Sequence, residues 1–114
     1  MDLFTRRDLD DLLAVRDGPC VSMFLPTHRA APETAQGPIR FKNTLRQVNG
    51  QLEQRGLISR ELREQLGELR SWLEDSGFWR HQRDGVVVFF ASTVHRRYRL
   101  PELVRAQFLI KDDF

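Results

Sequence analysis

An unbroken apolar run, Gly85-Val86-Val87-Val88-Phe89-Phe90-Ala91, lies in the C-terminal part of this 114-residue sequence. Its β-branched and aromatic residues favour a strand, and the lack of alternation with polar residues predicts a central strand covered on both faces. A second run, Cys20-Val21-Ser22-Met23-Phe24-Leu25-Pro26, is short, apolar and bounded by prolines, which also fits a buried strand.

Two further strands are expected after the central one, at His95 to Leu100 and at Leu103 to Ile110. Apolar residues at helical spacing predict three helices before it. The first begins at Thr5, the second runs from Pro38 to Gly56, and the third runs from Ser59 to Asp75. The order of these elements predicts an α/β (α+β) fold: a single domain whose mixed, roughly four-stranded sheet is packed with about three helices.

The length of the chain fits one domain with a single core, which needs no metal or disulfide for stability. The lone Cys20 cannot form an internal disulfide, and it fits a small buried apolar residue. The longest uninterrupted apolar run, Val86 to Ala91, is far shorter than the roughly 20 residues that span a bilayer. We therefore expect a cytoplasmic protein with no membrane partner.

The charge of the chain is distributed in blocks. Eighteen basic and 16 acidic residues give a net charge of +2. Residues 18–58 carry five basic and two acidic residues, which gives +3, and residues 77–100 carry five basic and one acidic residue, which gives +4. The two positive blocks would form one basic surface if the fold brought them together.

The helix predicted from Pro38 has one apolar and one basic face. Phe41, Leu45, Val48 and Leu52 fall within a stripe about 60° wide at 100° per residue, which is typical of a core-facing side. The opposite side has no acidic residue and carries Arg40, Lys42, Asn43, Arg46 and Gln47. An anionic partner such as RNA phosphate would explain this face, and a solvated surface would also explain it.

The segment from His28 to Gly37 shows no periodicity and is predicted to be a long loop, a position where binding residues often lie. His28 and Arg29 follow the end of a predicted strand and are candidates for binding; an exposed loop histidine is the alternative. Cys20 and His28 would lie roughly 26 Å apart at opposite ends of that strand, so they cannot form a nucleophile and base pair. No phosphate-binding glycine motif or metal-ligand spacing is present, so we expect no catalytic residue, cofactor or metal.

Three longer motifs follow one another along the chain: Gly18-Pro19-Cys20-Val21-Ser22-Met23-Phe24-Leu25-Pro26-Thr27-His28-Arg29, then Pro38-Ile39-Arg40-Phe41-Lys42-Asn43-Thr44-Leu45-Arg46, then Phe78-Trp79-Arg80-His81-Gln82-Arg83-Asp84-Gly85-Val86-Val87-Val88-Phe89-Phe90. In this order they resemble the N-terminal region of the bacterial relatives of archaeal and eukaryotic class-1 translation release factors and of the ribosome-rescue protein Pelota. The resemblance implies a release-factor N-domain-like fold. It also implies that residues 1–114 are a single N-terminal domain of a longer multidomain protein.

The release factors of this family read the stop codon with two N-domain motifs, which the chain matches only in part. Lys42 stands at the lysine of their Asn-Ile-Lys-Ser motif, with other neighbours. Phe108, Ile110 and Phe114 stand where the family has the Tyr, Cys and Phe of its Tyr-x-Cys-x-x-x-Phe motif, so the hydroxyl and the thiol are missing. Nothing in the chain resembles the Gly-Gly-Gln motif of the family's middle domain. The resemblance therefore implies a role other than stop-codon decoding.

The basic face and the resemblance together lead us to expect a non-catalytic domain directed to the ribosome or to its rRNA or mRNA, acting in ribosome rescue, hibernation or translation quality control. Lys42, Asn43 and Arg46 would face RNA, with Arg40, His28 and Arg29 at the edge of that surface. The first alternative is a protein-interaction or scaffolding domain, with self-association through an exposed edge strand as one form. The second is an enzyme domain that uses the loop from His28 to Gly37 as a small-molecule site.

Overall fold

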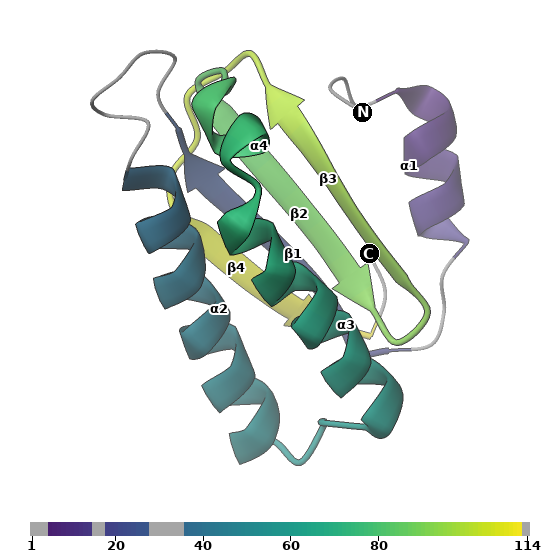
Figure 1. Cartoon of the computed structure of the whole chain (residues 1–114). Helices are drawn as coiled ribbons and strands as arrows, with labels where there is room; N and C mark the ends of the chain where they lie inside the picture. The colour runs from purple at the N-terminus through teal and green to yellow at the C-terminus, as the bar shows by residue number, and fades with distance from the viewer. Residues whose placement is uncertain (1–4, 15–17, 28–35, 113–114) are drawn as a thin grey trace.

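The computed structural model describes residues 5–14, 18–27 and 36–112 (Figure 1). The elements follow the chain in the order α1 (Arg6–Leu13), β1 (Cys20–Pro26), α2 (Gln36–Gln54), α3 (Arg60–Ser71), the 3₁₀ helix η2 (Trp72–Glu74), α4 (Ser76–Arg80), β2 (Gly85–Ala91), β3 (Val94–Leu100) and β4 (Gln107–Lys111). The predicted α/β fold class and the four strands of one sheet are confirmed. The sheet is not mixed, contrary to the prediction, because all the described strand pairs are antiparallel.

The strands lie in the order β3-β2-β1-β4 across the sheet. β1 pairs with β2 on one side and with β4 on the other, so that Met23 lies opposite both Val88 and Phe108. β2 and β3 form a hairpin in which Phe90 lies opposite His95. The helices α2, α3 and α4 all belong to the segment that connects the adjacent strands β1 and β2.

One face of the sheet is covered by α2, α3 and α4, which lie on the same side (Figure 1). The predicted apolar stripe of α2 and the buried leucines of α3 point into this layer. The buried residues are Phe41, Leu45, Val48 and Leu52 of α2, Leu62, Leu66 and Leu69 of α3, and Val21, Met23, Leu25, Val86, Val88 and Phe90 of the two central strands. Each large apolar side chain buried in this way stabilises the fold by about 1.5–3 kcal/mol.

The other face of the sheet is also buried over its β2 and β3 side. Val87 and Ala91 of β2 and Tyr98 of β3 are each at most 2% exposed. The central strand β2 is thus covered on both faces, as its sequence predicted. Cys20 is buried on this face as well, and its Sγ lies 3.8 Å from the backbone oxygen of Asp112, which confirms its role as a small packing residue. In Figure 1, α1 is drawn apart from α2, α3 and α4, to the right of β3 in this view.

Three predicted boundaries are wrong, and one of them is the end of the third helix, which lies at Ser71 rather than at Asp75. α2 begins at Gln36 rather than at Pro38, so the last two residues assigned to the loop belong to the helix. A proline in the first turn permits this, because none of the first four N–H groups of a helix has a partner within it. β4 begins at Gln107 rather than at Leu103, because Gln107 is the first residue that pairs with β1, and Leu103 is 76% exposed.

The connection from α3 to β2 contains a short helix that the sequence pattern did not reveal. The chain continues beyond α3 as η2, and Asp75 then caps a new helix, α4, by accepting a hydrogen bond from the backbone N–H of Phe78 at 3.1 Å. α4 carries Phe78 and Trp79 into the core, where they are 6% and 4% exposed. Both aromatic side chains therefore belong to the hydrophobic core.

The end of α2 follows its sequence closely. Gly56 has a φ of 68°, the left-handed conformation that glycine adopts at little cost. Its N–H donates to the backbone oxygen of Glu53 at 3.0 Å, and the N–H of Leu57 donates to that of Leu52 at 2.9 Å. These two bonds form a Schellman motif, which turns the chain toward α3. Ser59 then caps α3, as expected, by accepting from the N–H of Leu62 at 3.0 Å.

Candidate functional site

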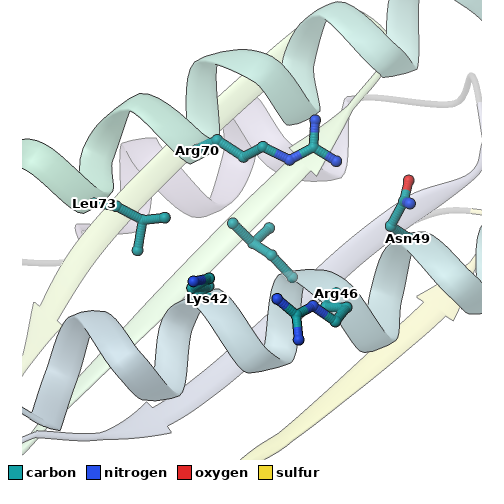
Figure 2. A pocket seen from close by; sticks show the side chains of 6 residues that line it. Lys42, Arg46, Asn49, Arg70 and Leu73 are labelled. Atoms are coloured by element: carbon teal, nitrogen blue, oxygen red, sulfur yellow. The ribbon is translucent and has the colours of Figure 1, made fainter.

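The polar side of α2 is divided into two parts by its position in the fold. At 100° per residue, Lys42, Arg46 and Asn49 fall within about 60° of one another on one flank of the helix. This flank faces α3, and Figure 2 shows the three side chains across from Arg70 and Leu73. Asn43 lies about 100° further round than Lys42 and does not join them.

The two helices enclose a cavity of about 320 Å³, which we call the α2–α3 groove. It is lined by Lys42, Leu45, Arg46, Asn49, Arg70 and Leu73. Leu45 belongs to the buried core, so the groove has apolar walls next to three basic side chains. These six side chains include no carboxylate, imidazole, thiol or hydroxyl group, which suits the groove to binding an anion rather than to acid–base catalysis.

The three basic residues of the groove have no acidic partner within the described ranges. Lys42, Arg46 and Arg70 take part in none of the salt bridges there, whereas the exposed Arg60 on α3 lies 3.6 Å from Glu64. Lys42 and Arg46 are also four residues apart on one helix, a spacing at which like charges destabilise it by a few tenths of a kcal/mol. A bound anion would relieve this repulsion.

Arg40 has a structural role that its sequence position did not reveal. Its Nη1 donates to the backbone oxygen of Pro26 at 3.4 Å, and its Nη2 donates to Oε1 of Gln36 at 2.9 Å. The side chain is half-buried and ties the start of α2 to the end of β1. Arg40 therefore does not line the groove.

The other predicted site residues are only partly brought together. Lys42 and Arg46 line the groove, and Asn43 is exposed on the neighbouring side of α2. His28 and Arg29 lie outside the described residues, as do residues 28–35 of the loop predicted from His28 to Gly37. Among the described residues, the groove is therefore formed by side chains of α2, α3 and η2.

Sequence reasoning missed Arg70 and Asn49. Arg70 stands on α3, along which acidic and basic residues alternate, a pattern typical of a solvated surface. The helical spacing of α3 nevertheless places Arg63, Gly67 and Arg70 within about 60° of one another, without an acidic residue among them. That flank was a signal, but only the packing of α3 beside α2 shows that Arg70 faces Lys42 and Arg46.

The two histidines of the described residues lie outside the groove. His81 is exposed, and His95 is half-buried with its Nδ1 2.6 Å from Oε1 of Gln65. Over residues 5–14, 18–27 and 36–112, no three His, Cys, Asp or Glu side chains are grouped in a way that would hold a metal ion. Among the helices of these same ranges, none combines the length and apolarity needed to cross a membrane.

Comparison of the sequence with protein-family models and with curated proteins gives no match. Neither comparison identifies a family for the chain. The functional interpretation therefore depends on the chemistry of the groove and on the order of the sequence motifs.

Proposed function

We propose that this chain is a non-catalytic RNA-binding domain that holds single-stranded RNA phosphates in the α2–α3 groove. The observation that carries the proposal is the group of three basic side chains, Lys42, Arg46 and Arg70, which line one cavity from two helices without an ion pair in the described part of the chain. Lys and Arg are the side chains that bind phosphate groups. The leucine walls beside them suit the apolar faces of the sugar and base.

The resemblance to release-factor relatives favours ribosomal RNA or mRNA as the partner, because Lys42 stands at the position of the family's codon-reading lysine. We propose a role in ribosome rescue, hibernation or translation quality control. Phe108 and Ile110 support a role other than stop-codon decoding, since both pack partly buried against the core on the helix-covered face of β4. In that position they present no codon-reading surface.

The test is charge reversal of the groove. The variant Lys42→Glu, Arg46→Glu, Arg70→Glu is compared with wild type for binding to an oligouridylate and for co-sedimentation with ribosomes. Three phosphate contacts predict that log K falls with log salt at a slope of about −2 for wild type, and that the slope approaches zero in the variant. Arg105→Glu is the control for a single charge reversal elsewhere, because Arg105 is exposed and does not line the α2–α3 groove.

All four of these side chains are exposed, so the variants should keep the melting temperature of wild type within a few degrees. Wild-type affinity in the groove variant would rule out the α2–α3 groove as the RNA site. An equal loss in Arg105→Glu would show that RNA responds to net charge alone.

A second candidate function is self-association through β4, which has β1 as its only paired neighbour among the described strands. Leu109 of β4 is 44% exposed on the face of the sheet away from α2. Pairing of this edge with a second copy would produce a mass that rises with concentration in light scattering and does not change with salt. Leu109→Lys should abolish that rise, and a constant monomer mass in wild type would exclude this function.

A further inference from the structure

A second basic cavity lies on the other side of the η2 turn from the α2–α3 groove. It has a volume of about 330 Å³ and is lined by Trp72, His95, Arg96 and Arg97, and we call it the β3 cavity. Leu73 lines the groove and the preceding residue, Trp72, lines the β3 cavity. Both residues belong to η2, so the two cavities share the η2 turn as a wall.

Arg96 reaches this cavity because β3 is an edge strand. Strand alternation places Arg96 on the face opposite to His95 and Arg97. In the structure, Nη1 of Arg96 donates to the backbone oxygen of His95 at 2.8 Å, and Arg96 lines the same cavity as Arg97. The long side chain can bend back in this way because no further described strand pairs with the outer edge of β3.

The four residues of the β3 cavity provide positive charge and no carboxylate. Arg97 is paired with Asp75 at 3.0 Å, whereas Arg96 takes part in no salt bridge within the described ranges. The oxygen of Gln65 that faces His95 can only accept a hydrogen bond, so the Nδ1 atom of His95 carries the proton. The exposed guanidinium of Arg96 is therefore the principal donor that the cavity offers to an anion.

The aromatic ring in the cavity is already occupied by contacts within the protein. Trp72 stacks on Phe41 with ring centroids 6.0 Å apart, and the guanidinium of Arg97 lies 4.7 Å from the Trp72 ring centroid. The guanidinium of Arg97 also lies 3.9 Å from the ring of Phe78, which fixes its position. Because Trp72 is packed in this way, the cavity is suited to a phosphate rather than to a stacked base.

We infer that the β3 cavity binds a second phosphate of the RNA strand held in the α2–α3 groove, so that the strand crosses the η2 turn between the two sites. The inference rests on the proposed function and adds the path of the strand to it. Arg96 is the binding residue, and the contact is independent of base sequence. A free phosphate could use the same donor, so the test includes both sources of phosphate.

The experiment compares wild type, Arg96→Gln and Arg96→Lys, each with an oligouridylate of about 12 nucleotides, a length within the usual range for single-strand-binding modules. Loss of one phosphate contact in Arg96→Gln should lower the affinity about fivefold, the scale of one exposed charge pair. It should also make the salt slope shallower by about 0.7. Arg96→Lys should restore most of the slope, because it restores the charge.

A dinucleotide, which has one internal phosphate, is the second ligand of the experiment, because it is too short to occupy both sites. It should bind in the groove alone, with the same affinity for wild type and Arg96→Gln. Unchanged affinity and salt slope for the long oligonucleotide in Arg96→Gln would overturn the proposed path while the groove proposal stands. Failure of wild type to bind either ligand would instead overturn the proposed function.

Titration with inorganic phosphate tests whether the β3 cavity binds free phosphate instead of an RNA phosphate. Trp72 is one of two tryptophans in the chain, and an anion beside it should change its fluorescence. A Trp72-dependent change with inorganic phosphate at micromolar concentration, together with an unchanged oligonucleotide slope in Arg96→Gln, would identify the cavity as a free-phosphate site. That result would overturn the inference of a continuous strand.

Discussion

The carboxylate of Asp75 accepts a hydrogen bond from Nη2 of Arg97 at 3.0 Å, which joins the start of α4 to the edge strand β3. The other oxygen of Asp75 accepts from the backbone N–H of Phe78 at 3.1 Å. One side chain therefore caps a helix and also holds the guanidinium that packs on Trp72 and Phe78. This contact fixes one wall of the β3 cavity.

Replacement of Asp75 should separate these two contributions. Asp75→Ala loses both the helix cap and the ion pair, and we expect the free energy of unfolding to fall by about 1–2 kcal/mol. Asp75→Asn keeps an oxygen for the N–H of Phe78 and should cost about half as much. Urea denaturation of the three proteins measures the difference, and equal losses in both variants would show that the cap contributes nothing.

The Asp75 contacts also predict an acid dependence. The hydrogen bond from the Phe78 N–H, and next the bond from Arg97, hold the pKa of the Asp75 carboxyl below its ordinary value of 3.8. A lowered folded-state pKa gives stability that is fully present above the ordinary value and is lost as pH falls through the folded-state value. The stability gap between wild type and Asp75→Asn should therefore be constant from pH 7 to about pH 5 and shrink below about pH 4. A gap that persists at the acid end would contradict this assignment.

Two glycines of the α2 region should respond to alanine with opposite signs. Neither an added Cβ at Gly50 nor one at Gly56 meets an atom within 4 Å, so the backbone alone decides the result. Gly50 lies within α2, and Gly50→Ala should stabilise the protein by about 1 kcal/mol. Gly56 has a φ of 68°, and Gly56→Ala should destabilise it by about 1 kcal/mol. Thermal or urea unfolding measures both, and a shared sign would refute the account of the Schellman motif.

Two asparagines of α2 test which side of this helix the RNA contacts. Asn49 lines the groove and Asn43 does not, although both are on the same helix. A carboxylate at position 49 would repel phosphate, so Asn49→Asp should weaken oligouridylate binding about fivefold at low salt. Asn43→Asp adds the same charge outside the groove and should weaken it by less than twofold at physiological salt, where the screening length is about 8 Å. A larger effect at Asn43 would place the RNA on the outer side of α2.

Replacement of Arg40 should lower the stability of the protein, whereas replacement of Lys42 should lower its RNA affinity. Arg40→Ala removes the bonds to the Pro26 oxygen and to Gln36, and it should lower stability by about 1 kcal/mol with little change in RNA affinity. Lys42→Ala removes an exposed groove cation and should weaken RNA binding without a change in stability. Fluorescence anisotropy measures the RNA affinity of both variants, and urea unfolding measures their stability. If Arg40→Ala lost mainly RNA affinity, Arg40 would belong to the RNA-binding surface.

The sequence alone determined the character of each element. The unbroken run from Gly85 to Ala91 predicted a strand buried on both faces, and the spacing of Phe41, Leu45, Val48 and Leu52 predicted the core side of α2. Ser59 and Gly56 marked helix ends that the structure confirms. These features were accessible because hydrophobic period, capping and left-handed backbone conformation are local properties of consecutive residues.

Only the tertiary structure decided which of the basic residues lie together. The packing of α3 beside α2 adds Arg70 to Lys42 and Arg46, and the bond to Pro26 removes Arg40 from that set. The position of β3 at the sheet edge allows Arg96 to join Arg97 against the expected alternation. Periodicity assigns a residue to a face of its own helix or strand, whereas the neighbour of that face is set by contacts between segments far apart in the chain.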